Sequence, residues 1–236
     1  MNIVEDVVAA NRILAEHGVL DGYGHVSIRA SDAPNRYLLA RSIAPEVVTA
    51  ADIMEFDLDS KPLDQRGRGM YSERFIHGEI YKTRPEVNAI VHNHSPSVIP
   101  FGVVAGSPLR PIYHMASFVG EGVPTFEIAD VQEDTDLLVR SPYLGQALAK
   151  CLGKCPAALM RGHGCVVVAE DIARVVGRSI YLEMNARLQA QAIGIGGAGG
   201  KIRYLSSGEV TASSATQDYS RAWSMWRAKA LEGLQR

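Results

Sequence analysis

Apolar side chains repeat along this chain with the period of a β-strand in some segments and with that of a helix in others. Because the two kinds of segment alternate, only a few fold classes are possible. Apolar and polar side chains alternate over residues 25–29, whereas residues 3–14 carry an apolar stripe at helical spacing. Further strands are predicted at residues 37–40, 53–58, 87–94, 123–128, 157–160 and 165–169. Further helices are predicted at residues 72–81, 171–193 and 214–234.

Short turns join some of these strands to their neighbours. Residues 25–29 and 37–40 flank the turn at residues 32–35, and residues 157–160 pair in the same way with 165–169. Hairpins among interleaved helices favour one layered α/β domain with a mixed sheet over a doubly wound parallel sheet. With no repeat or linker to divide the chain, residues 1–236 are expected to form that single domain.

Composition excludes several classes of protein. Hydrophobic residues make up 47% of the 236 residues and charged residues 21%, an ordinary globular mixture. The net charge of -2 comes without any charged run, so nucleic acid and anionic membranes are not expected partners. The N-terminal segment lacks the basic start of a signal peptide, and apolar runs are too short to span a membrane.

The cysteines indicate a reducing compartment. There are three, at positions 151, 155 and 165, an odd count without a disulfide framework. Cys151 and Cys155 lie at helical spacing and are expected to be buried thiols. We therefore expect a cytoplasmic protein.

Histidines provide the first candidate site. His92 and His94 lie two residues apart in a predicted strand, so their side chains point to the same face and can share one divalent metal. His163 lies between Gly162 and Gly164, which allow a tight turn in a crowded site. Spacing alone leaves open the alternative that these are ordinary structural histidines.

Glu73 follows Ser72 at the predicted start of a helix. The helix N-terminus would lower the pKa of its carboxyl, and a carboxylate beside a metal is suited to general acid or base catalysis. The alternative is an exposed glutamate that merely stabilises the helix dipole.

Three nucleotide-binding or hydrolase patterns are not supported by the sequence. Residues 194–199 match G-x-G-x-x-G, but they follow a helix instead of a strand, so we expect a flexible loop there. Lys201 is followed by Ile202 where a phosphate-binding loop has Ser or Thr, and the chain has no G-x-S-x-G motif.

Four motifs occur in a fixed order: Gly-His-Val-Ser-Ile-Arg at 24–29, Ser-Glu at 72–73, Ile-Val-His-Asn-His-Ser at 90–95 and Gly-His-Gly at 162–164. Together they resemble the class II aldolase/adducin family over nearly the whole chain. The resemblance implies a three-layer α/β/α domain around a central, largely antiparallel sheet, and usually a cyclic homotetramer with sites between subunits. It also implies that His92, His94 and His163 bind a divalent metal and that Glu73 is the acid/base.

The same resemblance includes non-catalytic members. Adducin-like proteins lack the metal-binding histidines and are structural, whereas this chain retains all three together with Glu73. The enzyme interpretation is therefore favoured over that of an interaction protein.

Departures from the family pattern concern the substrate. Sugar-phosphate members bind phosphate through Gly-Asn-x-Ser, Ser-Gly and Ser-Ser, and here His25 replaces the Asn, while Ser42-Ile43 and Tyr71-Ser72 replace the two pairs. These changes remove compact donors or add bulk, so the phosphate pocket looks rebuilt. Ser72 remains a candidate substrate-binding residue.

A carboxylate is the expected replacement. His25, Arg41 and Arg161 could recognise a planar carboxylate, although each could equally be structural. Residues 113–124 resemble the branch of the family that decarboxylates hydroxylated aromatic acids, such as 3-hydroxy-2-methylpyridine-4,5-dicarboxylate and dihydroxyphthalate.

We therefore predict a metal-dependent carbon–carbon lyase, a decarboxylase of a hydroxylated aromatic or heteroaromatic (di)carboxylate. Glu73, or a histidine such as His114, would protonate the ring carbon after CO2 leaves. The alternative is an aldolase that cleaves a small hydroxy-carbonyl or sugar-phosphate substrate, since both reactions place negative charge next to a metal ligand. Three imidazoles suit zinc, and manganese, iron or cobalt could also bind.

Overall fold

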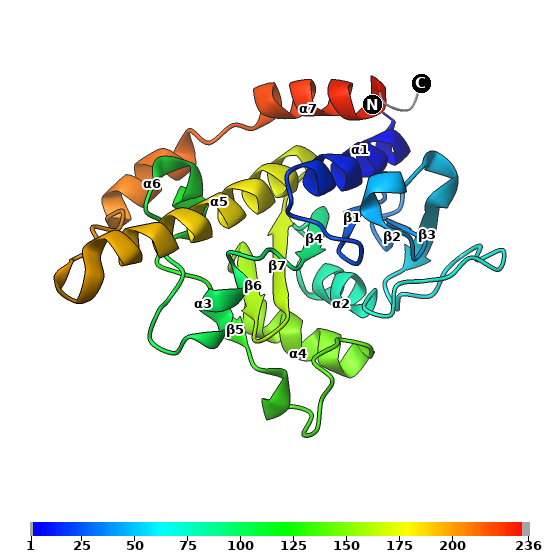
Figure 1. The fold of residues 1–236 in the computed structure, drawn as a ribbon. Helices are drawn as coiled ribbons and strands as arrows, with labels where there is room; N and C mark the ends of the chain where they lie inside the picture. Colours follow the sequence, from blue (N-terminus) through cyan, green and yellow to red (C-terminus); the bar gives the residue numbers. More distant parts are fainter. Residues whose placement is uncertain (1, 233–236) are drawn as a thin grey trace.

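A seven-stranded mixed sheet organises the chain, whose residues 2–232 are described by a computed structural model (Figure 1). The strands are β1 (His25–Arg29), β2 (Arg36–Ala40), β3 (Ile53–Asp57), β4 (Ala89–Asn93), β5 (Thr125–Phe126), β6 (Ala157–Met160) and β7 (Gly164–Ala169). Their order in the sheet is β3-β2-β1-β4-β7-β6-β5. β5 and β6 pair in parallel, and the other pairings among the described residues run antiparallel. The two predicted hairpins, β1–β2 and β6–β7, are confirmed.

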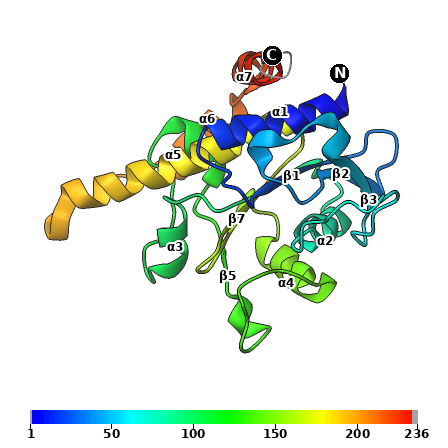
Figure 2. The ribbon, with the colours of Figure 1, turned by 45° about the vertical axis from the view of Figure 1, so that its right-hand side comes forward.

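Helices lie on both sides of this sheet. The α-helices are α1 (Ile3–Glu16), α2 (Phe75–Thr83), α3 (Ile99–Val103), α4 (Pro142–Leu152), α5 (Ile172–Gly196), α6 (Ser207–Ala215) and α7 (Ser220–Glu232). Short 3-10 turns are η1 (Pro45–Val47), η2 (Ala50–Asp52), η3 (His114–Val119), η4 (Ile128–Asp130) and η5 (Gly197–Gly199). Figure 2 shows α1 and α5 on one side of the strands and α2 and α4 on the other.

The strand period of two separates two apolar clusters. In β4, Ala89 and Val91 join the cluster that contains residues of α1 and α5, whereas Ile90 joins the cluster that contains residues of α2 and α4. The same alternation places Val167 of β7 in the first cluster and Val168 in the second. The central strands are therefore buried on both faces, which explains their nearly continuous apolar sequence.

The C-terminal third differs from the sequence prediction. The glycine-rich residues 194–199 do not form a loop, because α5 continues through Gly196 and ends where Gly197 adopts a φ of 54°. The predicted helix at 214–234 is divided into α6 and α7, which residues 216–219 separate. Tyr219 in this break packs against the bare backbone of Gly177 in α5. Trp223 of α7 is buried in the cluster that includes α1.

Other differences are smaller. The strand predicted at 123–128 is reduced to β5, and α3 and α4 were not anticipated. Cys151 and Cys155 are only partly buried, whereas Cys165 in β7 is fully buried. Within the described residues, none of the helices combines the length and apolar character that crossing a bilayer requires.

Candidate metal centre and adjoining pocket

Strand pairing brings the first candidate residues together. His25 of β1 is the register partner of His92 of β4, and both lie on the sheet face that α2 covers, together with Ile90. β4 ends at Asn93, and His94 continues in the same direction, so the rings of His92 and His94 lie 5.0 Å apart between centroids. The prediction that these two imidazoles converge is confirmed.

His163 reaches them from the β6–β7 turn, where its two glycine neighbours have separate roles. Gly162 adopts a φ of 68°, a left-handed conformation that favours glycine. A Cβ added to Gly164 would lie 2.1 Å from the carbonyl oxygen of Asn93, so a larger residue would push β7 away from β4. The ring of His163 is thereby held 4.9 Å from the ring centroids of both His92 and His94.

Each imidazole is oriented by an acceptor at its Nδ1. His92 Nδ1 lies 3.1 Å from the Cys165 carbonyl oxygen, and His163 Nδ1 lies 2.8 Å from that of Leu137. His94 Nδ1 lies 3.0 Å from a carboxylate oxygen of Asp21. Because a neutral imidazole that donates from Nδ1 keeps a lone pair on Nε2, all three rings present Nε2 as a ligand atom.

These three Nε2 atoms meet in a small volume beside Glu73. One ligand atom from each of the four residues lies within 4.8 Å of the others, and Nε2 of His94 and of His163 are 3.0 Å apart. Nε2 of His92 is fully buried and has no hydrogen-bond partner among residues 2–232. A buried lone pair without a donor is costly unless a cation satisfies it. The donor set therefore fits a divalent metal ion.

Glu73 closes the cluster on the side of α2. Its Oε1 accepts the backbone N–H of Val139 at 2.8 Å, and its Oε2 lies 3.6 Å from His92 Nε2 and 3.5 Å from His163 Nε2. Burial raises the pKa of the Glu73 carboxyl, but His163 and His92 outweigh burial and hold that pKa well below its usual value. Burial lowers the pKa of His163, but the opposite effect of Glu73 is larger, so the pKa of His163 is raised overall.

The expected helix dipole does not cause this shift. α2 begins at Phe75, and Glu73 lies in the turn before the helix instead of in its first turn. The sequence placed the helix start at Ser72 because a capping residue stands there, yet the structure has no side-chain cap hydrogen bond at this end of α2. The neighbouring imidazoles of His163 and His92 lower the pKa of Glu73 instead.

The loop before α4 supports both sides of the cluster. Leu137 accepts from His163 and Val139 donates to Glu73, so two residues of this loop, separated by one, fix two of the four groups. Leu137 has a φ of 69°, a conformation that costs a non-glycine residue about 1 kcal/mol or more. Strain of this kind is typical of backbone that a functional site has to place.

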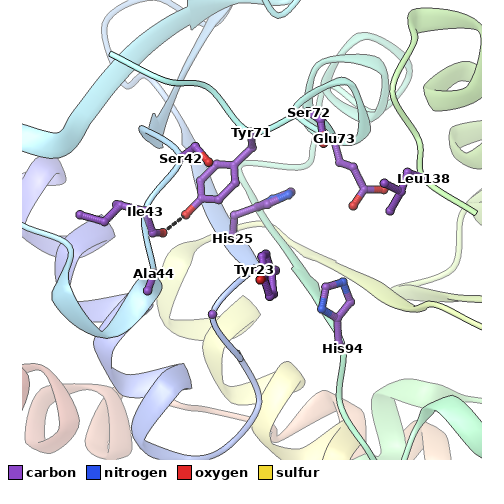
Figure 3. Close-up of a pocket in the computed structure, with 11 residues that line it drawn as sticks. Tyr23, His25, Ser42, Ile43, Ala44, Tyr71, Ser72, Glu73, His94 and Leu138 are labelled. Carbon is purple, nitrogen blue, oxygen red and sulfur yellow. Dashed lines mark hydrogen bonds between the residues drawn. The ribbon is translucent and has the colours of Figure 1, made fainter. Parts of the chain in front are cut away.

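A pocket of about 290 Å³ opens next to these residues. Its lining combines two members of the cluster with aromatic, small polar and backbone groups: Gly22, Tyr23, His25, Ser42, Ile43, Ala44, Tyr71, Ser72, Glu73, His94 and Leu138. Figure 3 shows His25 between Tyr71 and Glu73, with His94 below Glu73 in this view. Of the predicted substrate-binding residues, His25 and Ser72 line it.

The two predicted arginines are engaged elsewhere. Nε of Arg41 donates to Asp52 at 2.6 Å, and Arg41 does not line this pocket although its neighbour Ser42 does. Arg161 donates to both carboxylate oxygens of Glu127, at 2.9 Å for Nη2, beside a different hollow near Phe101. In one chain, each guanidinium already has a carboxylate partner.

His114 is also away from the pocket. It is exposed at the start of η3 and is not among the residues that line the pocket or form the metal cluster. Within one chain the structure therefore does not bring His114 to the other predicted site residues.

Asp21 and His77 are neighbours of the site that were not predicted, and Tyr71 was noted only as a replacement in the rebuilt phosphate pocket. Asp21 orients His94, while its other carboxylate oxygen accepts the backbone amides of Tyr23 and Gly24. Tyr71 forms a wall of the pocket, with its ring 4.5 Å from that of His25 between centroids. His77 lies in the first turn of α2, four residues after Glu73, and this spacing in the predicted helix was the available signal for it.

Burial controls the charge of the inner histidines. It lowers the pKa of His25 well below the usual value, and it lowers the pKa of His77 to about 3. Burial also lowers the pKa of His92, against the opposing effect of Glu73. All three are therefore neutral near pH 7, the form in which imidazole accepts a metal or a hydrogen bond.

Comparisons with known proteins agree with this geometry. Residues 5–190 match the family described as "Class II Aldolase and Adducin N-terminal domain". The decarboxylase tropJ of Talaromyces stipitatus is 33% identical over 94% of this chain and 92% of its own length. A 3,4-dihydroxyphthalate decarboxylase of Arthrobacter keyseri is 32% identical over 82% of this chain and 80% of its own.

Solved structures show the same fold. An L-fuculose 1-phosphate aldolase from Glaciozyma antarctica PI12 superposes with a TM-score of 0.77 at 21% identity, over 99% of this chain and 88% of its own. The names of these relatives, two decarboxylases and an aldolase, are those of lyases. The family resemblance drawn from the four ordered motifs is thereby confirmed: the chain belongs to the class II aldolase and adducin family.

Proposed function

We propose that this lyase is a divalent-metal-dependent decarboxylase of a hydroxylated aromatic or heteroaromatic (di)carboxylate. The observation that supports it most directly is the convergence of three Nε2 atoms and the Glu73 carboxylate within 4.8 Å, at the edge of a pocket with aromatic walls. Similarity to the two decarboxylases over most of the chain supports the reaction type.

The donor set specifies how the metal would be held. His92, His94 and His163 are the proposed ligands, with zinc as the best match to three imidazoles, and with manganese, iron or cobalt as alternatives. A divalent cation bound there would act as a Lewis acid toward the negative charge that develops when the carbon–carbon bond breaks.

Glu73 is the proposed proton carrier. Its Oε1 is fixed by Val139, so the group that remains available to accept or deliver a proton is Oε2. His163 and His92 favour its ionised form, which suits a base that would take the proton of the substrate's ring hydroxyl and deliver it to the ring carbon that CO2 leaves, so that the product is the phenolate. Glu73 lines the pocket, so a substrate bound there would lie next to its carboxylate.

The pocket walls favour a planar ring. The rings of Tyr71 and His25 lie side by side, and Tyr23 adds an exposed aromatic side chain to the same lining. The hydroxyl of Tyr71 already donates to the Ile43 carbonyl, so it presents its ring and not its hydroxyl to the pocket. Such a surface suits an aromatic substrate better than it suits a phosphate.

Some assignments depend on a neighbouring subunit. We propose a cytoplasmic homotetramer in which the site lies near a subunit interface. That arrangement is required if His114 is to act as proton donor. It is equally required if Arg41 and Arg161 are to bind the substrate carboxylate. We also propose that the single domain extends over residues 1–236. It would be a three-layer α/β/α domain with a largely antiparallel sheet.

Release of CO2 from a panel of ortho-hydroxy aromatic dicarboxylates tests the function. Zinc-loaded protein should release CO2, and chelator should abolish that release. Glu73→Gln keeps a carbonyl for the Val139 amide but cannot ionise, so it should retain the metal while turnover falls by at least roughly a hundredfold. The exposed Glu86→Gln is the matched control. Unchanged turnover in Glu73→Gln would move the acid/base role to another residue.

An aldolase is the second candidate, because the fold matches an aldolase and the same cluster would stabilise an enediolate. No CO2 from protein shown to contain metal, together with cleavage of a sugar phosphate or free sugar, would favour this alternative. A non-catalytic, adducin-like role ranks below both because the three histidines and Glu73 are present together.

A further inference from the structure

A chain of buried polar side chains runs from the pocket wall into the space between α2 and the sheet. His25 Nδ1 lies 2.6 Å from His77 Nε2, and His77 Nδ1 lies 2.6 Å from the Ser27 hydroxyl. Ser27 in turn lies 2.8 Å from the hydroxyl of Tyr81. All four residues are at most 1% exposed, and the proposed reaction uses only His25.

The number of protons on these four side chains allows only two arrangements of hydrogen-bond donors and acceptors. Both rings are buried without a carboxylate hydrogen bond among the described residues, so each is neutral and a single proton lies in the 2.6 Å contact between His25 Nδ1 and His77 Nε2. In the inward arrangement Tyr81 donates to Ser27, Ser27 donates to His77, and His77 donates to His25. In the outward arrangement every donor is reversed, and the Tyr81 hydroxyl must find an acceptor beyond Ser27.

The surroundings of the Tyr81 hydroxyl decide between these two arrangements. The acceptor next in line for Tyr81 is the Asn88 carbonyl at 3.5 Å, beyond the usual range of an O–H···O hydrogen bond. The inward arrangement uses the 2.8 Å contact with Ser27 instead, so both hydroxyls and the His77 N–H are paired and only the His25 N–H is left to face the pocket. Because an unpaired buried donor costs about 1–3 kcal/mol, the inward arrangement is favoured.

We propose that His77, Ser27 and Tyr81 hold His25 in its Nε2–H tautomer, so that His25 presents a neutral, fixed hydrogen-bond donor to an anionic oxygen of the substrate in the pocket. The part that concerns the substrate rests on the proposed function, with a carboxylate as that oxygen. His77 and Ser27 act through His25 as positioning residues, since neither lines the pocket.

The donor has a consequence for selectivity. A neutral imidazole that donates from Nε2 carries no positive charge. The His25 ring can therefore lie 5.1 Å from the His92 ring, between centroids, without electrostatic repulsion of a metal bound there. It favours a carboxylate or phenolate oxygen and disfavours a substrate group that itself must donate.

The tautomers can be read directly by NMR of the full-length protein with 15N-labelled histidine, since protonated and unprotonated ring nitrogens resonate far apart. We expect both His25 and His77 to carry their proton on Nε2, with assignments from the signals that disappear in His25→Gln and His77→Gln. Nδ1 protonation of both rings would overturn the proposal. This readout does not depend on any activity, so it stands apart from failure of the proposed function.

Binding of phthalate to zinc-loaded protein, measured by calorimetry, tests recognition. His25→Gln retains an N–H donor near the position of Nε2, whereas His25→Leu has none. We expect the dissociation constant to rise by about tenfold to a hundredfold in His25→Leu and by less than about threefold in His25→Gln, the range for a hydrogen bond to a charged group. Equal weakening in both variants would overturn the assignment of a donor to His25.

Discussion

At the scale of single residues, His92 combines complete burial with an unpartnered nitrogen. Replacing it with alanine removes one of three proposed metal ligands but leaves both apolar clusters untouched. We expect His92→Ala to lose metal and activity while its far-ultraviolet circular dichroism matches that of the metal-free parent. Metal content measured by atomic absorption is the deciding quantity.

The exposed His17 at the end of α1 is the matched control for that experiment. His17→Ala should keep the full metal content because it contacts Trp226 and not the cluster. Full activity of His92→Ala without bound metal would contradict the site assignment.

At the scale of secondary-structure elements, the close approach of β4 and β7 holds the site together. Gly164→Ala would place a Cβ 2.1 Å from the Asn93 backbone, between β4, which carries His92, and β7, which directly follows His163. We expect a loss of roughly 1–3 kcal/mol in the free energy of unfolding, the usual range for overpacking, together with weaker metal binding. Urea unfolding of the metal-free protein and a zinc titration would measure both effects.

Gly208 in α6 provides the comparison, because an added Cβ there meets nothing within 4 Å. Gly208→Ala should be neutral or stabilising by up to about 1 kcal/mol through helix propensity. If both variants behaved alike, close packing at Gly164 would not be the cause.

At the scale of the whole molecule, buried neutral histidines make stability depend on pH. The pKa of His77 is about 3 in the folded protein and near 6.5 in the unfolded chain, so the unfolded state binds an extra proton between these values. Stability is therefore highest above pH 6.5 and falls as pH decreases toward 3, by about 1.4 kcal/mol per pH unit for this residue. His25 and His92 act in the same direction, and His163 opposes them.

Urea unfolding of chelator-treated protein between about pH 6 and about pH 4 measures this dependence. The glutamine side chain in the variant His77→Gln cannot titrate. The free energy of unfolding of this variant should therefore vary less steeply with pH than that of the parent, by the contribution of about one proton. An identical slope in the two proteins would show that His77 is not buried in its neutral form.

Local sequence determined the parts of this protein that depend on short-range periodicity. Side chains two apart on a strand share a face whatever the rest of the fold, so the convergence of His92 and His94 could be predicted. The glycines beside His163 likewise indicated a tight turn, and the alternation within residues 25–29 and the short apolar run at 165–169 located β1 and β7.

The tertiary structure decided everything that depends on contacts between distant segments. Arg41 and Arg161 were expected at the substrate, but Asp52, from the connection between β2 and β3, and Glu127, 34 residues from Arg161, pair with them. His77 joins the site only because β1 places His25 and Ser27 against α2. The ring orientations that make three Nε2 atoms converge come from Cys165, Asp21 and Leu137, which are 26 to 73 residues away from the histidines that they hold. Residue types and their local period set which groups are available, whereas hydrogen bonds of long sequence separation set which atoms face the site.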